Sequence, residues 1–147
     1  NTDNNADTGG GVFLMENGTL NINGGSITGN TTESVGGWTD KNNGGAIHMY
    51  GGTVNITGNA SITGNTAQGL GGAIYKRSGT LNISGNPTIT GNTGNQVTQN
   101  IYLLSGQYVT VNGNITGGSV GITADTSRNT AGAQFANGNP IPDWICL

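Results

Sequence analysis

The sequence predicts an all-β parallel β-helix, a β-solenoid in which the chain winds into stacked coils. The stretch Gly44–Thr66, GGAIHMYGGTVNITGNASITGNT, returns 27 residues later at Gly71–Thr93 as GGAIYKRSGTLNISGNPTITGNT. A fixed repeat of this length marks one structural unit stacked on itself. Within each copy, short runs of alternating apolar and polar residues are separated by Gly or Gly-Asn. This pattern is typical of strands with one buried face.

The composition fits one repetitive, weakly charged domain. The chain has 147 residues, of which 29 are Gly; only 7% are charged, and the net charge is −3. The few Lys and Arg residues form no basic patch, so we expect no nucleic-acid partner. No apolar run reaches the ~20 residues of a membrane-spanning helix. Cys146 is the single cysteine, so no disulfide within the chain is expected.

The repeats divide the chain into three parts. We expect a polar lead-in at residues 1–8, either flexible or a loose first coil, and β-helix repeats over residues 9–123. An insertion at residues 31–43 spaces the first two copies 34 residues apart instead of 27. The repeats stop after Thr123, and residues 124–147 are expected to cap the last coil or to join a longer protein.

Stacking at about 4.8 Å per coil places equivalent residues in columns along the stack. We expect three short strands per coil, about four to five coils, and an interior filled by aliphatic side chains. The predicted interior columns are Phe13–Ile47–Ile74–Ile101, Leu20–Val54–Leu81–Val109, Ile22–Ile56–Ile83–Val111 and Ile27–Ile62–Ile89–Ile115. Asn30, Asn65 and Asn92 close the successive ITGN runs, and we expect their amides to hydrogen-bond along a column in a purely structural role.

The pairing of GGAI with a closing I-x-x-N resembles the repeats of chlamydial polymorphic outer membrane proteins, whose motifs are GGA[ILV] and FxxN. The first motif stands at Gly44–Ile47 and Gly71–Ile74, and more loosely at Gly10–Phe13. The second stands at Ile27–Asn30, Ile62–Asn65 and Ile89–Asn92, with Ile in place of Phe. The chain is also similar to bacterial and archaeal adhesin-like surface proteins with such repeats. The resemblance covers about residues 9–123 and implies a right-handed parallel β-helix in a secreted or cell-surface adhesin or stalk.

Enzymatic chemistry is not expected on the regular coils. Polysaccharide-cleaving β-helices need carboxylates gathered on one face, as acid and base or as Ca²⁺ ligands. The stretch from Gly44 to Gly121 contains no Asp or Glu. His48 is the single histidine, and one exposed His makes a weak catalytic or metal candidate. The sequence therefore predicts a protein that is not an enzyme and has no metal or cofactor.

Two groups of side chains are candidates for adhesive binding to a surface glycan or a host protein. His48, Tyr75 and Tyr102 occupy equivalent positions next to interior residues, so we expect an outward ladder of rings. Trp38 lies in the insertion, and loops on rigid scaffolds often carry binding residues. A structural role of the ladder and packing of Trp38 against the scaffold remain the alternatives.

Ice binding is the alternative function, because the outward positions form flat, nearly uncharged ranks of hydroxyl and amide groups. Strand spacing repeats such ranks at about 4.7–4.8 Å along the stack, and the grid resembles the Thr-rich faces of β-solenoid ice-binding proteins. The same residues also suit exposed strand positions without any such function. The candidate ice-binding residues are Thr28, Ser61, Thr63, Thr88, Thr90 and Thr116 on one face and Thr53, Asn55, Thr57, Thr80 and Asn82 on another.

Overall fold

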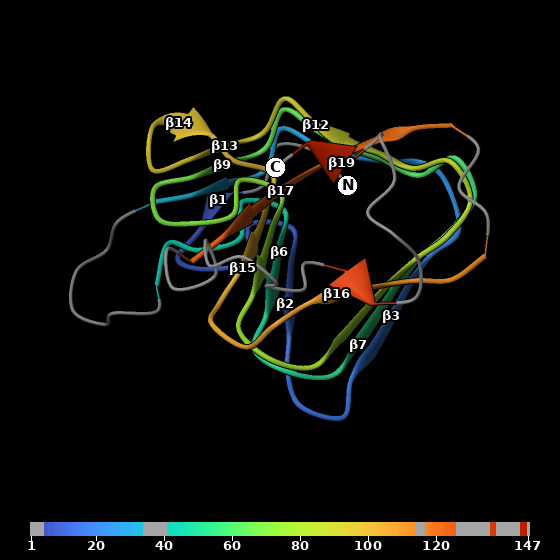
Figure 1. Ribbon diagram of the computed structural model, residues 1–147. Helices are drawn as coiled ribbons and strands as arrows, with labels where there is room; N and C mark the ends of the chain where they lie inside the picture. The colour runs from blue at the N-terminus through green and yellow to red at the C-terminus, as the bar shows by residue number, and fades with distance from the viewer. Residues whose placement is uncertain (1–4, 34–40, 114–116, 126–135, 138–144, 147) are drawn as a thin grey trace.

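Short strands recur once per coil and pair in parallel with their counterparts in the next coil, which confirms the β-helix (Figure 1). This computed structural model describes residues 5–33, 41–113, 117–125, 136–137 and 145–146. The described residues contain strands, turns and bends and no helix. Each central coil carries three strands of three or four residues and a fourth strand of two residues, as in β6 (Ile47–Met49), β7 (Thr53–Ile56), β8 (Ser61–Thr63) and β9 (Thr66–Ala67).

The four strand positions of a coil form four faces, which we number in chain order. Face 1 contains β2 (Val12–Leu14), β6 (Ile47–Met49), β10 (Ile74–Lys76) and β15 (Ile101–Leu103). Face 2 contains β3 (Thr19–Ile22), β7 (Thr53–Ile56), β11 (Thr80–Ile83), β16 (Val109–Val111) and β18 (Ala136–Asn137). In Figure 1 the strands of face 2 lie behind one another at the lower right, which is the view expected along a stack of coils.

Faces 3 and 4 close the coil. Face 3 contains β4 (Ser26–Thr28), β8 (Ser61–Thr63) and β12 (Thr88–Thr90). Face 4 contains β1 (Asn5–Ala6), β5 (Thr31–Thr32), β9 (Thr66–Ala67), β13 (Thr93–Gly94) and β14 (Val97–Thr98), and lies at the upper left of Figure 1. β14 is the exception to the parallel pairing, because it returns antiparallel to β13. Part of the polar lead-in, Asn5–Ala6, thus pairs with the first regular coil through β5.

The last described coil is shorter than the others. β17 (Ser119–Ala124) pairs with β12 through Ser119 and Val120 and with β15 through Ile122 to Ala124, so it continues from face 3 directly into face 1. No face 4 strand lies between them. At the crossing, a Cβ on Gly121 would lie 2.3 Å from Nδ2 of Asn100, so a larger residue would displace the Asn100 amide, which accepts a hydrogen bond from Asn92. Two described pieces beyond Thr123 extend the stack: β18 pairs with β16, and β19 (Ile145–Cys146) pairs with β17.

The interior is filled by the aliphatic columns that the sequence predicts, with two corrections. Ile22, Ile56, Ile83 and Val111 stack in register, as do Leu20, Val54 and Leu81. In the first column, Val12 and not Phe13 pairs with Ile47. In the fourth column, Ile89 pairs with Val120; Ile115, which was expected there, lies outside the described residues.

The first correction has a local cause. Gly9 and Gly10 donate backbone hydrogen bonds to Asn43 and Gly44, so the run Gly9–Val12, and not Gly10–Phe13, is equivalent to Gly44–Ile47. Gly9 has a φ of 54° and Gly44 a φ of 69°, which supports the same alignment. A shift of one residue moves a side chain to the opposite side of a strand. Phe13 therefore points outward, and the turn after Leu14 is one residue longer than its counterpart after Met49, which restores the register at Leu20.

Candidate functional site

A column of rings runs along the outer side of face 1, where the sequence placed His48, Tyr75 and Tyr102. The register pairs Phe13 with His48, His48 with Tyr75, and Tyr75 with Tyr102. The ring centroids of Phe13 and His48 are 5.1 Å apart, those of His48 and Tyr75 5.0 Å, and those of Tyr75 and Tyr102 6.0 Å. The first two pairs meet edge to face and the third is stacked, so both favourable arrangements of ring pairs occur.

The middle of this ring column is not available to a ligand. His48 is 1% exposed and Tyr75 is 3% exposed, so the expectation of an exposed ladder was wrong for these two residues. Thr8 Oγ1 hydrogen-bonds with Nδ1 of His48 and covers it from the lead-in side. Tyr102 stays half-buried. Trp38, the other candidate of this group, lies outside the described residues.

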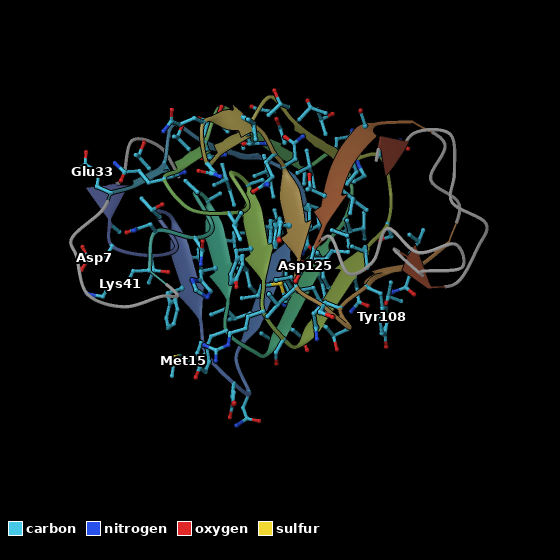
Figure 2. All side chains as sticks on the ribbon, turned by 60° about the vertical axis from the view of Figure 1, so that its left-hand side comes forward. Asp7, Met15, Glu33, Lys41, Tyr108 and Asp125 are labelled. Carbon is cyan, nitrogen blue, oxygen red and sulfur yellow. The ribbon has the colours of Figure 1, made fainter. Side chains whose placement is uncertain are left out.

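The exposed end of the ring column is formed by side chains that the sequence analysis missed. Phe13 is 42% exposed, and its ring lies 6.2 Å from that of the half-buried Tyr50. The guanidinium of Arg77 lies 4.3 Å from the centroid of the Tyr50 ring, within the range of a cation–π contact. Met15, 57% exposed, extends away from the body of the protein near this end (Figure 2). We call Phe13, Tyr50 and Arg77 the aromatic cluster.

The hydroxyl ranks of face 3 are in register. Ser61 pairs with Ser26 and Thr88, and Ser119 continues this rank. Thr28, Thr63 and Thr90 form the second rank. Thr63 and Thr90 are half-buried. Thr116, expected in this rank, lies outside the described residues.

The amides of face 2 differ from the hydroxyls of face 3, because they are bonded to one another. Asn82 Nδ2 donates to Asn55 Oδ1 at 2.7 Å, and Asn55 Nδ2 donates to Asn21 Oδ1 at 2.8 Å. Thr57 Oγ1 donates to Asn23 Oδ1 at 3.0 Å. Thr53 and Thr80 pair in register beside them. The candidates of face 2 are thus in place as ranks, but its amides are already partnered.

Face 4 contains a hollow that the sequence analysis did not single out. It has a volume of about 350 Å³ and is lined by Thr66, Ala67, Gln68, Thr93 and Gln96. In the sequence, the hollow is marked by a departure from the repeat. The residues TQN at Thr98–Asn100 stand at the positions where the previous coil has GGA at Gly71–Ala73. The hollow is neutral, because its lining holds hydroxyl, amide and methyl groups and no ionised side chain.

The described residues hold no group of three or more His, Cys, Asp or Glu side chains that could bind a metal ion. Among the residues that the structure describes, Lys41 Nζ lies 3.7 Å from Asp7 Oδ2 and forms an ion pair with it, at the left of Figure 2. No helix among them is long and apolar enough to cross a membrane. No family model, curated protein or solved structure matches this sequence.

Proposed function

We propose that this chain is a non-catalytic β-helix module of a secreted or cell-surface adhesin-like protein, which presents a rigid binding surface to a glycan or a host protein. The observation that carries the proposal is the aromatic cluster: two partly exposed rings and a guanidinium at the end of a buried ring column. The buried part of that column fixes the orientation of Phe13 before any ligand arrives, which reduces the entropy lost on binding.

The chemistry of the aromatic cluster suits a sugar ring. Aromatic faces contact the apolar C–H face of a pyranose, while the guanidinium supplies several hydrogen-bond donors in a fixed plane. The Arg77 guanidinium is held over Tyr50 at 4.3 Å, so donors and ring share one small surface. The similarity of the GGAI and I-x-x-N motifs to those of surface-protein repeats also supports an adhesive role.

The direct test is glycan-array binding of the whole chain with Phe13→Ala and Tyr50→Ala. Each variant should bind at least about 10-fold more weakly, the size expected for one lost ring contact. Tyr108→Ala is the matched control, because Tyr108 has the same 42% exposure as Phe13 and belongs to a different surface. Trp38→Ala tests the insertion separately. Unchanged binding in both cluster variants would remove the aromatic cluster from the proposal.

Ice binding is the second candidate, and the register of face 3 favours it. The hydroxyls of Thr63 and Thr90 are half-buried and spaced by one coil, about 4.8 Å. The alternative is tested by thermal hysteresis and ice-affinity partitioning. If the protein binds ice through face 3, Thr63→Tyr abolishes the activity, because a bulky ring lifts the face from the lattice. Thr57→Tyr on face 2 is the control and should leave the ice-binding activity unchanged. Equal effects of the two variants on that activity would exclude face 3 as the ice-binding surface.

A further inference from the structure

The hollow on face 4 is bordered by an unusual hairpin. β13 and β14 pair through Thr93 with Thr98 and through Gly94 with Val97, so Asn95 and Gln96 form a two-residue turn. Asn95 has a φ of 48° and Gln96 a φ of 64°. Two successive positive φ values define the tight hairpin turn that is usually made by Asn-Gly. Asn tolerates this conformation, whereas Gln at the second position strains the backbone.

The strained residue is the one that lines the hollow. Gln96 lines it and Asn95 does not. A Gly at position 96 would make the same turn without strain, so the turn itself does not require Gln. Backbone strain of this kind concentrates where a side chain is held for binding. The hairpin thus places an amide over a surface that already carries hydroxyl groups.

The rest of the lining provides complementary hydrogen-bonding groups. Thr66 and Thr93 are Cα partners in β9 and β13, so their side chains stand side by side on the outer surface. Gln68 follows β9 and adds a second amide. Hydroxyls and amides both donate and accept hydrogen bonds, and none of these groups carries a charge. A volume of about 350 Å³ is at the small end of ligand pockets.

We propose that this hollow is a binding site for a neutral saccharide unit, with Gln96, Gln68, Thr66 and Thr93 as the groups that recognise its hydroxyls. The inference rests on the proposed glycan-binding function and adds a second site on a different face. A neutral, hydroxyl-rich ligand matches a lining of uncharged donors and acceptors. An anionic sugar would lose its hydration without gaining a cationic partner in the lining.

The experiment compares Gln96→Gly with Asn95→Gly in the whole chain. Binding is measured with a panel of neutral hexose and N-acetylhexosamine oligosaccharides and with uronic-acid oligosaccharides of equal length. Gln96→Gly should bind the neutral ligand at least about 10-fold more weakly, while its Tm rises by roughly 2–5 °C because the strain is relieved. Asn95→Gly changes the same turn without touching the lining, so its affinity should equal that of the original protein.

The outcomes separate this inference from the proposed function. Loss of binding in Phe13→Ala but not in Gln96→Gly would contradict saccharide binding in the hollow. The proposed role of the aromatic cluster would then be supported on its own. Equal binding of uronic-acid and neutral oligosaccharides at the hollow would contradict the proposed preference for a neutral ligand. A titration followed by NMR gives the second readout, since the side-chain amide resonances of Gln68 and Gln96 should shift with the neutral ligand. Unshifted amides at saturation would also overturn the inference.

Discussion

A lysine occupies one position of an otherwise apolar interior column. Lys76 pairs with Met49 on one side and Leu103 on the other, and it is 2% exposed. Its Nζ donates to Gln107 Oε1 at 2.5 Å and lies 5.8 Å from the ring centroid of Tyr108. The stem of the side chain therefore fills the column, while the ammonium reaches the corner between faces 1 and 2. This is how long cationic side chains are accommodated near an apolar core.

We predict that Lys76→Met is tolerated and that Lys76→Ala is not. A Met side chain is similar in length to the Lys stem and packs against the neighbouring Met49. Removing a buried ammonium also offsets the lost hydrogen bond to Gln107. The free energy of unfolding should therefore change by less than about 1.5 kcal/mol. Lys76→Ala leaves a cavity and should lower it by about 2–4 kcal/mol. Urea denaturation measures both. Equal losses in the two variants would contradict the assignment of the stem to the core.

Tyr102 links the ring column to the pH dependence of stability. Burial, and then the negative charge of Asp125, raise the pKa of Tyr102 above its usual value of 10.0. The folded state therefore favours the neutral phenol. The stability that this preference contributes is fully present below the unfolded pKa near 10 and is lost as the pH rises through the folded pKa.

We predict that the free energy of unfolding falls more steeply above pH ~10 in the original protein than in Tyr102→Phe, which has no phenol to ionise. Between about pH 7 and pH 9 the two proteins should show parallel pH dependence. Denaturant titrations across this range measure the difference. Identical curves up to about pH 11.5 would contradict a stabilising neutral phenol at this position.

The coils are joined by two asparagine ladders, one buried and one on the surface. In the buried ladder, Asn30 Nδ2 donates to Asn65 Oδ1, Asn65 Nδ2 to Asn92 Oδ1 and Asn92 Nδ2 to Asn100 Oδ1, each at 2.9 Å. The backbone N–H of Asn30 also donates to Asn65 Oδ1, at 3.0 Å. The surface ladder of face 2 points the other way, since Asn82 and Asn55 donate toward the N-terminal coil. Hydrogen bonds along the stack thus supplement the strand pairing.

We predict that Asn65→Ala lowers the free energy of unfolding by about 2–4 kcal/mol, because it leaves the buried N–H and amide of Asn30 without their acceptor. Asn55→Ala is the matched control, since it removes the equivalent central link of the surface ladder, where water replaces the lost bonds; its cost should stay below about 1 kcal/mol. Thermal and urea unfolding measure both. A similar cost for the two substitutions would contradict the distinction between the ladders.

At the scale of the whole molecule, stability comes from stacked apolar layers and neutral hydrogen bonds. Ile56 and Ile62 in the second coil are 0% exposed, whereas Ile22 and Ile27 in the first coil are 7% and 9% exposed. Each layer is covered by its neighbours, so a coil depends on the coils above and below it. Charge contributes little to stability, because only 7% of the residues are charged and the Lys41–Asp7 pair is partly exposed.

We predict that salt scarcely affects stability. Exposed ion pairs contribute about 0–1 kcal/mol, and screening acts only on such terms. The free energy of unfolding should change by less than about 0.5 kcal/mol between about 0.05 and about 0.5 M NaCl. Lys41→Ala should likewise cost less than about 0.5 kcal/mol. A loss of more than about 2 kcal/mol in either experiment would show that electrostatic interactions hold the coils together.

The sequence by itself determined the parallel β-helix, most of its interior columns and the buried asparagine ladder. Ile56 and Ile83, or Asn65 and Asn92, stand 27 residues apart, and a constant spacing places identical residues in one column whatever the corners look like. The tertiary structure decided features that depend on unequal spacing or on neighbours from other coils. The longer turn after Leu14 set the register that turns Phe13 outward, and β17 joined two faces without a fourth side. Burial of His48 and the strained turn at Gln96 follow from contacts across coils and from an exact hairpin length, which periodicity does not encode.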